Sequence, residues 1–163
     1  MIVLGIDPGT HRMGFGLVLQ EKGKQNLKDY GCIYTSKSST DEDRLVELYT
    51  AVKKLIHTHN PDSIALESLF FTTNAKTAMA VGQARGIVLL ACGQEKKPVA
   101  TYAPLEVKLA VTGYGKAGKT QVQQMVKSIL RLSKILKPDD AADAVAIALT
   151  HCFSYKLKQS NLL

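Results

Sequence analysis

The chain has 163 residues, of which 45% are hydrophobic and 21% are charged. This composition is typical of one soluble globular domain with a buried core, and it excludes a fibrous or low-complexity protein. The net charge of +7 at pH 7 favours a polyanionic partner, with nucleic acid first and an anionic membrane second. We therefore expect a single domain over residues 1–163.

The positive charge is concentrated in residues 96–137, which contain nine basic residues and one acid, Glu106. Mixed signs would serve solubility equally well, so this excess favours a surface that binds a polyanion. The basic residues are Lys96, Lys97, Lys108, Lys116, Lys119, Lys127, Arg131, Lys134 and Lys137.

No basic amino-terminal region precedes a long apolar segment, and no apolar run reaches the length of a membrane span. We therefore expect no signal peptide, no membrane association and a cytoplasmic location. Three cysteines, Cys32, Cys92 and Cys152, are far apart and lack the spacing of a zinc site. We predict that they are reduced residues of the core.

The first ten residues contain an apolar run that leads into Asp7 and is ended by Pro8 and Gly9. This pattern predicts a strand buried on both faces, with Asp7 at its end. A carboxylate at that position costs free energy unless it is paired or binds a cation. The alternative is an Asx-turn in which Asp7 bonds the backbone near Gly9.

The segments that follow predict a mixed α/β order. Two strands joined by a polar turn would form an antiparallel meander with the first strand. Thr40 is a plausible N-cap for an amphipathic helix that Asn60 and Pro61 end. The remaining strands alternate with helices, which predicts a five-stranded mixed sheet with helices on both faces and the first strand beside the fourth. The expected strands are 13–20, 27–36, 63–67 and 99–102, and the later helices are 74–92, 104–112, 120–132 and 139–156.

Four carboxylates are candidates for one site. Glu67 ends a short apolar strand, as Asp7 does, while Asp140 and Asp143 are three residues apart and therefore share one face at a helix start. Complementation of the helix dipole explains Asp140 adequately, but it explains Asp143 less well because the neighbours of Asp143 are apolar. Oxygen ligands without nearby His or Cys favour Mg²⁺ or Mn²⁺. Two such ions, about 4 Å apart, can clamp the attacking and leaving oxygens of a phosphoryl displacement.

The motifs around these acids resemble the RuvC family of Holliday junction resolvases, which have a ribonuclease H-like fold. The resemblance extends over the whole chain and implies that Asp7, Glu67, Asp140 and Asp143 are metal-binding catalytic acids. Some relatives have His at the position of Asp140. The motifs that carry the resemblance are GIDPGT at 5–10, Glu67 followed by Phe70, NAKTAMAVGQARG at 74–86, the loop to Lys119, and DAADAVAIA at 140–148.

The resemblance implies a homodimeric endonuclease with two Mg²⁺ ions per subunit that cuts four-way DNA junctions symmetrically in recombination and repair and leaves 5′ phosphates. On this hypothesis one ion, between Asp7 and the Asp140/Asp143 helix, activates a water. A second ion, near Asp7 and Glu67, stabilises the leaving 3′ oxygen. The implied partners are the RuvA–RuvB branch-migration proteins.

Several other residues have candidate roles, and the resemblance assigns those of Phe70, Lys108 and Lys119. Phe70 would contact an exposed base, while Phe71 is expected to fill the core. Lys108 and Lys119 would approach the active centre, and Lys116 would contact the DNA backbone. Gly82 and Gly86 give one face of their helix little side-chain bulk, which is consistent with packing on the sheet or with a two-fold dimer.

Three other functions compete with this interpretation. Residues 113–120 match GxxxxGKT, the phosphate-binding loop of ATPases, but the segment before them is expected to be a helix rather than the strand that this motif requires. GIDPGT also resembles the first phosphate loop of actin-like ATPases, whose chains are much longer. The third alternative is a junction-binding protein without catalysis, and the complete set of acids argues against it.

Overall fold

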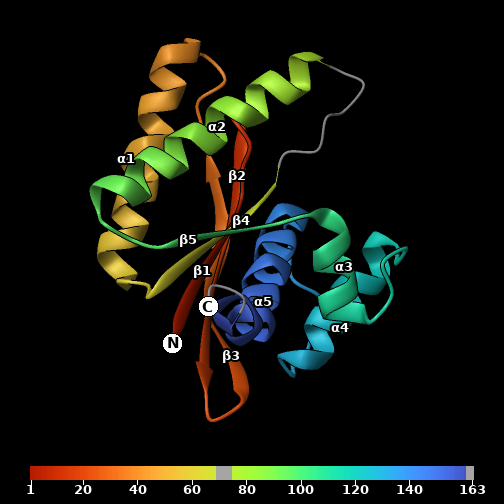
Figure 1. Cartoon of the computed structure of the whole chain (residues 1–163). Coiled ribbons are helices and arrows are strands. Elements are labelled where there is room, and N and C mark those ends of the chain that lie inside the picture. Colours follow the sequence, from red (N-terminus) through yellow and green to blue (C-terminus); the bar gives the residue numbers. More distant parts are fainter. Residues whose placement is uncertain (69–74, 161–163) are drawn as a thin grey trace.

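The computed structural model describes residues 1–68 and 75–160, with no account of the side chains of 75–77 and 156–160. A five-stranded mixed sheet in the order β3-β2-β1-β4-β5 has α1 and α2 on one face and α5, with α3 and α4, on the other (Figure 1). The elements are β1 (Ile2–Asp7), β2 (Arg12–Glu21), β3 (Lys24–Tyr34), α1 (Asp41–His59), β4 (Ser63–Glu67), α2 (Ala75–Gln94), β5 (Val99–Tyr102), α3 (Pro104–Thr112), α4 (Lys119–Ile129) and α5 (Asp139–Ser160).

The central strand is β1, which pairs antiparallel with β2 and parallel with β4. Its side chains alternate between two apolar cores because successive residues of a strand point to opposite faces. Val3 belongs to the core under α5, whereas Leu4 and Ile6 belong to the core under α1 and α2. The continuous apolar run therefore correctly predicted a strand buried on both faces and located beside β4.

Helix α1 begins and ends where the sequence predicted. Thr40 is its N-cap, and the Thr40 Oγ1 accepts a hydrogen bond from the backbone N–H of Asp43 at 3.3 Å. At the other end Asn60 adopts a left-handed conformation, with φ of 41°, and its N–H donates to the carbonyl of Ile56. Each cap satisfies backbone groups that a helix end leaves unpaired.

Helix α5 lies directly against β1 and β2 because glycines of these strands leave room for its backbone. A Cβ atom at Gly5 would lie 2.1 Å from the carbonyl oxygen of Ala144, and one at Gly14 would lie 2.0 Å from that of Asp140. The alanines of α5 keep its near face thin, as the sequence suggested. This close approach brings the first turns of α5 next to the carboxyl end of β1.

The structure differs from the sequence predictions mainly at element ends. Strand β3 begins at Lys24 rather than near residue 27, because the hairpin pairs as far as Glu21 and Lys24. Cys32 is only partly buried because it lies on the edge strand β3, which corrects the prediction of three core cysteines, although all three are free.

Helix α3 precedes the loop at residues 113–118, so the context that the ATPase phosphate loop needs is absent there. Within residues 1–68 and 75–160, no helix has the length and apolarity to cross a membrane.

Candidate active site

The candidate acids come from three elements that meet at one end of the sheet. Asp7 is the last residue of β1, and Glu67 is the last residue of the neighbouring parallel strand β4. Ile6 of β1 pairs with Leu66 of β4, and Asp7 and Glu67 are the next residues of these two neighbouring strands. Asp140 and Asp143 come from the first turns of α5, which lies over Gly14, the partner of Asp7 in β2.

Asp7 carries the largest electrostatic perturbation of the four acids. Burial, followed by the negative charges of Glu67, Asp143 and Asp140, raises the pKa of Asp7 from 3.8 to about 7. Three like charges can raise the pKa of one carboxyl only when they lie near it. The structure therefore brings all four predicted acids into one electrostatic cluster around Asp7.

Glu67 and Asp143 are perturbed in the same direction. Burial and the charge of Asp143 raise the pKa of Glu67, while Lys108 lowers it. Burial also raises the pKa of Asp143, which the hydrogen bond and charge of Lys119 partly offset. Raised carboxyl pKa values within a cleft mark a site that stabilises a cation or handles a proton.

The C-terminal end of β4 is held by a residue that the sequence analysis did not single out. Arg85 of α2 donates from Nη1 to the carbonyl of Glu67 at 2.8 Å and from Nη2 to Thr101 Oγ1 at 3.0 Å. These bonds tie the end of β4 to β5 and α2 and so orient the backbone that carries Glu67. The signal in the sequence was a single arginine within a helix of small and apolar residues.

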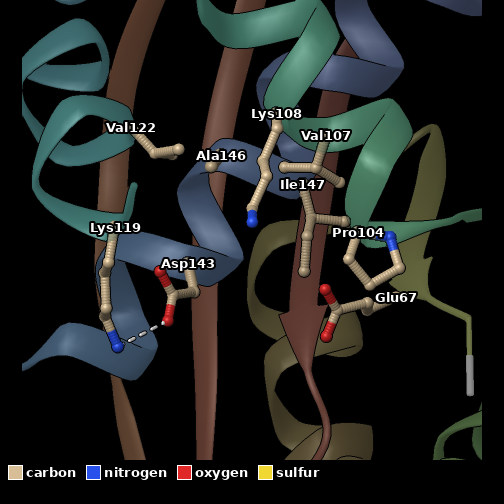
Figure 2. A pocket seen from close by; sticks show the side chains of 9 residues that line it. All are labelled: Glu67, Pro104, Val107, Lys108, Lys119, Val122, Asp143, Ala146 and Ile147. Atoms are coloured by element: carbon tan, nitrogen blue, oxygen red, sulfur yellow. Dashed lines mark ion pairs between the residues drawn. The ribbon is translucent and has the colours of Figure 1, made fainter. Parts of the chain in front are cut away.

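Two of the predicted lysines line a cavity of about 220 Å³ together with Glu67 and Asp143 (Figure 2). Lys108 extends from α3 towards the space between the two carboxylates, and Lys119, the first residue of α4, forms an ion pair with Asp143 at 3.1 Å. Burial lowers the pKa of Lys119, but Asp143 and Asp139 outweigh it and raise the pKa overall. Both ammonium groups are therefore positioned to neutralise negative charge in this cavity.

Asp140 faces a different hollow. Its Oδ2 atom lies 2.6 Å from Nε of Arg12, yet this buried oxygen has no hydrogen-bond partner. The adjoining hollow, of about 500 Å³, is lined by residues 9–12, Asp140 and two residues of α2, Ala80 and Val81. Asp7 is coupled electrostatically to the acids of both hollows.

The donor set fits a hard divalent cation. It consists of carboxylates alone, burial followed by the charges of neighbouring acids raises the pKa values of Asp7, Glu67 and Asp143, and one buried oxygen of Asp140 has unused hydrogen-bonding capacity. Within residues 1–68 and 75–160, no three His, Cys, Asp or Glu side chains are already arranged to hold one ion. Two of the four carboxylates are paired with cationic side chains instead, Asp143 with Lys119 and Asp140 with Arg12.

The loop after Asp7 is held by another residue that the sequence analysis missed. Buried Arg44 of α1 donates to Thr35 Oγ1 at 2.8 Å, and that hydroxyl donates to the carbonyl of Thr10, also at 2.8 Å. A buried arginine within an amphipathic helix cannot be distinguished by pattern from the exposed charges around it.

The predicted DNA contacts differ in what the structure describes of them. Phe70 and Phe71 lie outside the described residues, which stop at 68 and resume at 75. Lys116 is exposed in the loop before α4, away from both hollows. Its ammonium group is therefore not one of the cations that face the acids.

Comparison with known proteins gives consistent matches over almost the whole chain. The profile of the family described as Crossover junction endodeoxyribonuclease RuvC matches residues 3–151. The chain is 46% identical to the protein of this name from Alkaliphilus oremlandii over 151 residues, which is 93% of this chain and 92% of the relative. It is 48% identical to that from Finegoldia magna over 161 residues, or 99% and 98% of the two chains. The structure of Thermus thermophilus RuvC in complex with a Holliday junction substrate superposes with a TM-score of 0.91 at 36% identity, covering 97% of this chain and 96% of the other.

Proposed function

Because the chain belongs to the RuvC family of crossover junction endodeoxyribonucleases, we propose that it resolves Holliday junctions through Asp7, Glu67, Asp140 and Asp143. The enzyme is a phosphodiester hydrolase that acts in DNA recombination and repair. We further propose that residues 1–163 act as one nuclease domain and that its cuts are paired, symmetrical and leave 5′ phosphates.

One arrangement supports the assignment of the acids: Asp7 and Glu67 end paired neighbouring strands, and the close approach of α5 to Gly14 brings Asp140 and Asp143 to the same end of the sheet. Burial and the other three carboxylates raise the pKa of Asp7 to about 7. A buried carboxylate beside three other carboxylates has no structural benefit, whereas a bound cation reverses the penalty. An Asx-turn at Asp7 or helix-dipole complementation at Asp140 would not require the four carboxylates to lie near one another.

We propose Mg²⁺ as the cofactor, with two ions per subunit and Mn²⁺ as a substitute. Asp7, Glu67, Asp140 and Asp143 would hold the ions, which would supply Lewis-acid stabilisation of the charge that develops on the phosphodiester oxygens. Lys108 extends towards the cavity between Glu67 and Asp143, so it can neutralise a phosphate there. The side chain of Lys119 is 54% exposed, so its ammonium group can leave Asp143 and bind a phosphate instead.

The DNA contacts outside this cavity are proposals of the same kind. Phe70 contacts an unpaired base at the junction, and Lys116 contacts the phosphate backbone. The exposed position of Lys116 supports the second of these assignments. Lysine contacts to phosphates predict binding that weakens steeply with salt.

A homodimer would supply two equivalent sites for the two strands of a junction. An exposed apolar stripe on α2 supports this proposal. Met79 and Leu90 are 67% and 51% exposed, and at Gly86 and Gly93 an added Cβ would meet no atom within 4 Å. Met79 and Leu90 are about three helical turns apart and therefore lie on one face of α2. Exposed large apolar side chains on one helix face are typical of an interface. RuvA–RuvB branch-migration proteins as partners and a cytoplasmic location complete the proposal.

The experiment that tests this function is cleavage of a synthetic mobile four-way junction in Mg²⁺ and in EDTA. A linear duplex of the same sequence serves as the substrate control, and Asp143→Asn serves as the protein control. Symmetrical nicking of the junction alone, only with Mg²⁺ and only with Asp143 present, is the expected result. Tight junction binding without cutting in Mg²⁺ or Mn²⁺, across several sequences, would instead identify a junction-binding protein without catalysis.

A further inference from the structure

Arg12 has a position that no part of the expected reaction explains. It begins β2, and its Nε atom lies 2.6 Å from Oδ2 of Asp140. The basic residues that the composition emphasised lie in residues 96–137, far along the chain from this arginine. The ion-pair partner of Arg12 is thus Asp140, which is one of the four candidate metal ligands.

The backbone that carries Arg12 is held firmly, while its side chain is not. The N–H of Thr35 donates to the carbonyl of His11 at 3.3 Å, and the hydroxyl of Thr35 donates to the carbonyl of Thr10 at 2.8 Å. The side chain of Arg12 is nevertheless 53% exposed, compared with 21% for Asp140. A guanidinium on an anchored backbone can change partners by rotation of its side chain alone.

The contact between Arg12 and Asp140 is close but poorly matched. Oδ2 of Asp140 is buried and accepts no hydrogen bond, so the short distance reflects charge attraction without good hydrogen-bond geometry. A charged pair that lacks a hydrogen bond is weaker than a bidentate arginine–carboxylate pair. Beside this pair lies the hollow of about 500 Å³ between residues 9–12 and α2, which gives the guanidinium space to leave Asp140.

We propose that Arg12 and a divalent cation compete for Asp140. When the cation binds, the guanidinium of Arg12 leaves Asp140 and binds a DNA phosphate instead. A cation that takes Oδ2 must displace Arg12, and a phosphate is the partner that a guanidinium binds best. Cation binding and DNA binding would thereby assist each other at this position. The inference rests on the proposed function, because it requires that Asp140 binds a cation.

The first test measures Mn²⁺ binding to the protein without DNA, from the electron paramagnetic resonance signal of free Mn²⁺. Arg12→Gln should bind Mn²⁺ about two- to five-fold more tightly than the wild type, which is the range that loss of a partly exposed ion pair allows. Arg12→Lys should lie between the two. Lys24→Gln, which removes the same charge at the distant end of the β2–β3 hairpin, controls for net charge and should leave affinity unchanged.

The second test needs neither cation nor cleavage. Junction affinity is measured in EDTA by fluorescence anisotropy for the wild type, Arg12→Gln, Asp140→Asn and the double variant. Asp140→Asn removes the charge that holds Arg12 and frees the guanidinium to bind a phosphate. Arg12→Gln should therefore weaken junction binding about three- to ten-fold in the Asp140→Asn background, but only slightly where Asp140 is intact. The salt slope should fall by about 0.9 per lost phosphate contact in the Asp140→Asn background.

The outcomes separate this inference from the function on which it rests. Equal Mn²⁺ affinities of the wild type and Arg12→Gln, or an equal effect of Arg12→Gln on junction binding in both backgrounds, would overturn the role of Arg12 alone. Failure of the wild type to bind Mn²⁺ would overturn the carboxylate site and the exchange together. A circular dichroism spectrum and a thermal transition for each variant exclude misfolding as the cause of a change.

Discussion

The cluster of acids predicts that Asp7 lowers the stability of the protein when no cation is bound. Its pKa is raised from 3.8 to about 7, chiefly by burial and then by the three neighbouring carboxylates. A carboxyl with a raised pKa in the folded state binds protons there more readily than in the unfolded state. Its contribution to stability is therefore least favourable above pH 7 and improves as the pH falls towards 4.

The size of this effect follows from the shift. A shift of roughly three pKa units corresponds to about 4 kcal/mol at pH 8, since one unit corresponds to about 1.4 kcal/mol. At pH 5 only about 2 kcal/mol of this penalty remains, because the folded carboxyl is then largely protonated. The isosteric, neutral substitution Asp7→Asn should raise the free energy of unfolding by up to these amounts, while it abolishes cleavage.

The assays are urea denaturation and thermal melting between pH 5 and pH 8, both followed by circular dichroism, first in EDTA and then in Mg²⁺. A gain of about 4 kcal/mol would raise the melting temperature by about 10 °C in a chain of this size. Mg²⁺ should stabilise the wild type and not Asp7→Asn, because a ligand that binds only the folded state adds to stability. Asp41→Asn, in the first turn of α1, is the matched control and should change stability by less than about 1 kcal/mol. A variant at Asp7 that is less stable than the wild type at pH 8, or a gain that does not shrink at pH 5, would refute the reasoning.

Three further predictions concern single contacts. Lys119→Gln should slow junction cleavage about 10²- to 10³-fold in a single-turnover assay without lowering the melting temperature, because its ammonium faces Asp143 and the cavity; unchanged cleavage would assign it to the surface. Arg85→Met should cost about 1–3 kcal/mol in urea denaturation and also slow cleavage, since two hydrogen bonds that orient the end of β4 are lost; a loss of stability without any effect on rate would separate Arg85 from the site. Thr40→Ala should cost about 1 kcal/mol of stability and leave cleavage unchanged, because Thr40 caps α1 on the far side of the sheet, whereas Thr40→Ser should restore the loss.

Much of the fold could be predicted from the sequence because its signals are local. Short apolar runs, each bounded by turn residues, indicated the strands that end at Asp7 and Glu67. Thr40 and Asn60 marked the ends of α1 because capping depends on a few adjacent residues. The mixed sheet with a central β1 followed from the order of the elements, since a short connection favours an antiparallel pair and a helical crossover favours a parallel one.

The sequence by itself also determined which acids to consider. A carboxylate at the end of a buried strand, or among the alanines of α5, is costly enough to require an explanation wherever it occurs. Asp7, Glu67, Asp140 and Asp143 could therefore be named without coordinates, and the structure places all four in one electrostatic cluster.

Only the tertiary structure decided that Arg12 and Arg85 contact this site. They come from different elements, and the partner of each, Asp140 for Arg12 and the backbone carbonyl of Glu67 for Arg85, lies on another element that is distant in the chain. Whether a surface arginine remains solvated or pairs with a distant carboxylate depends on how closely helices pack on the sheet. Here the glycines of β1 and β2 admit the backbone of α5, and this contact brings Asp140 within 2.6 Å of Arg12.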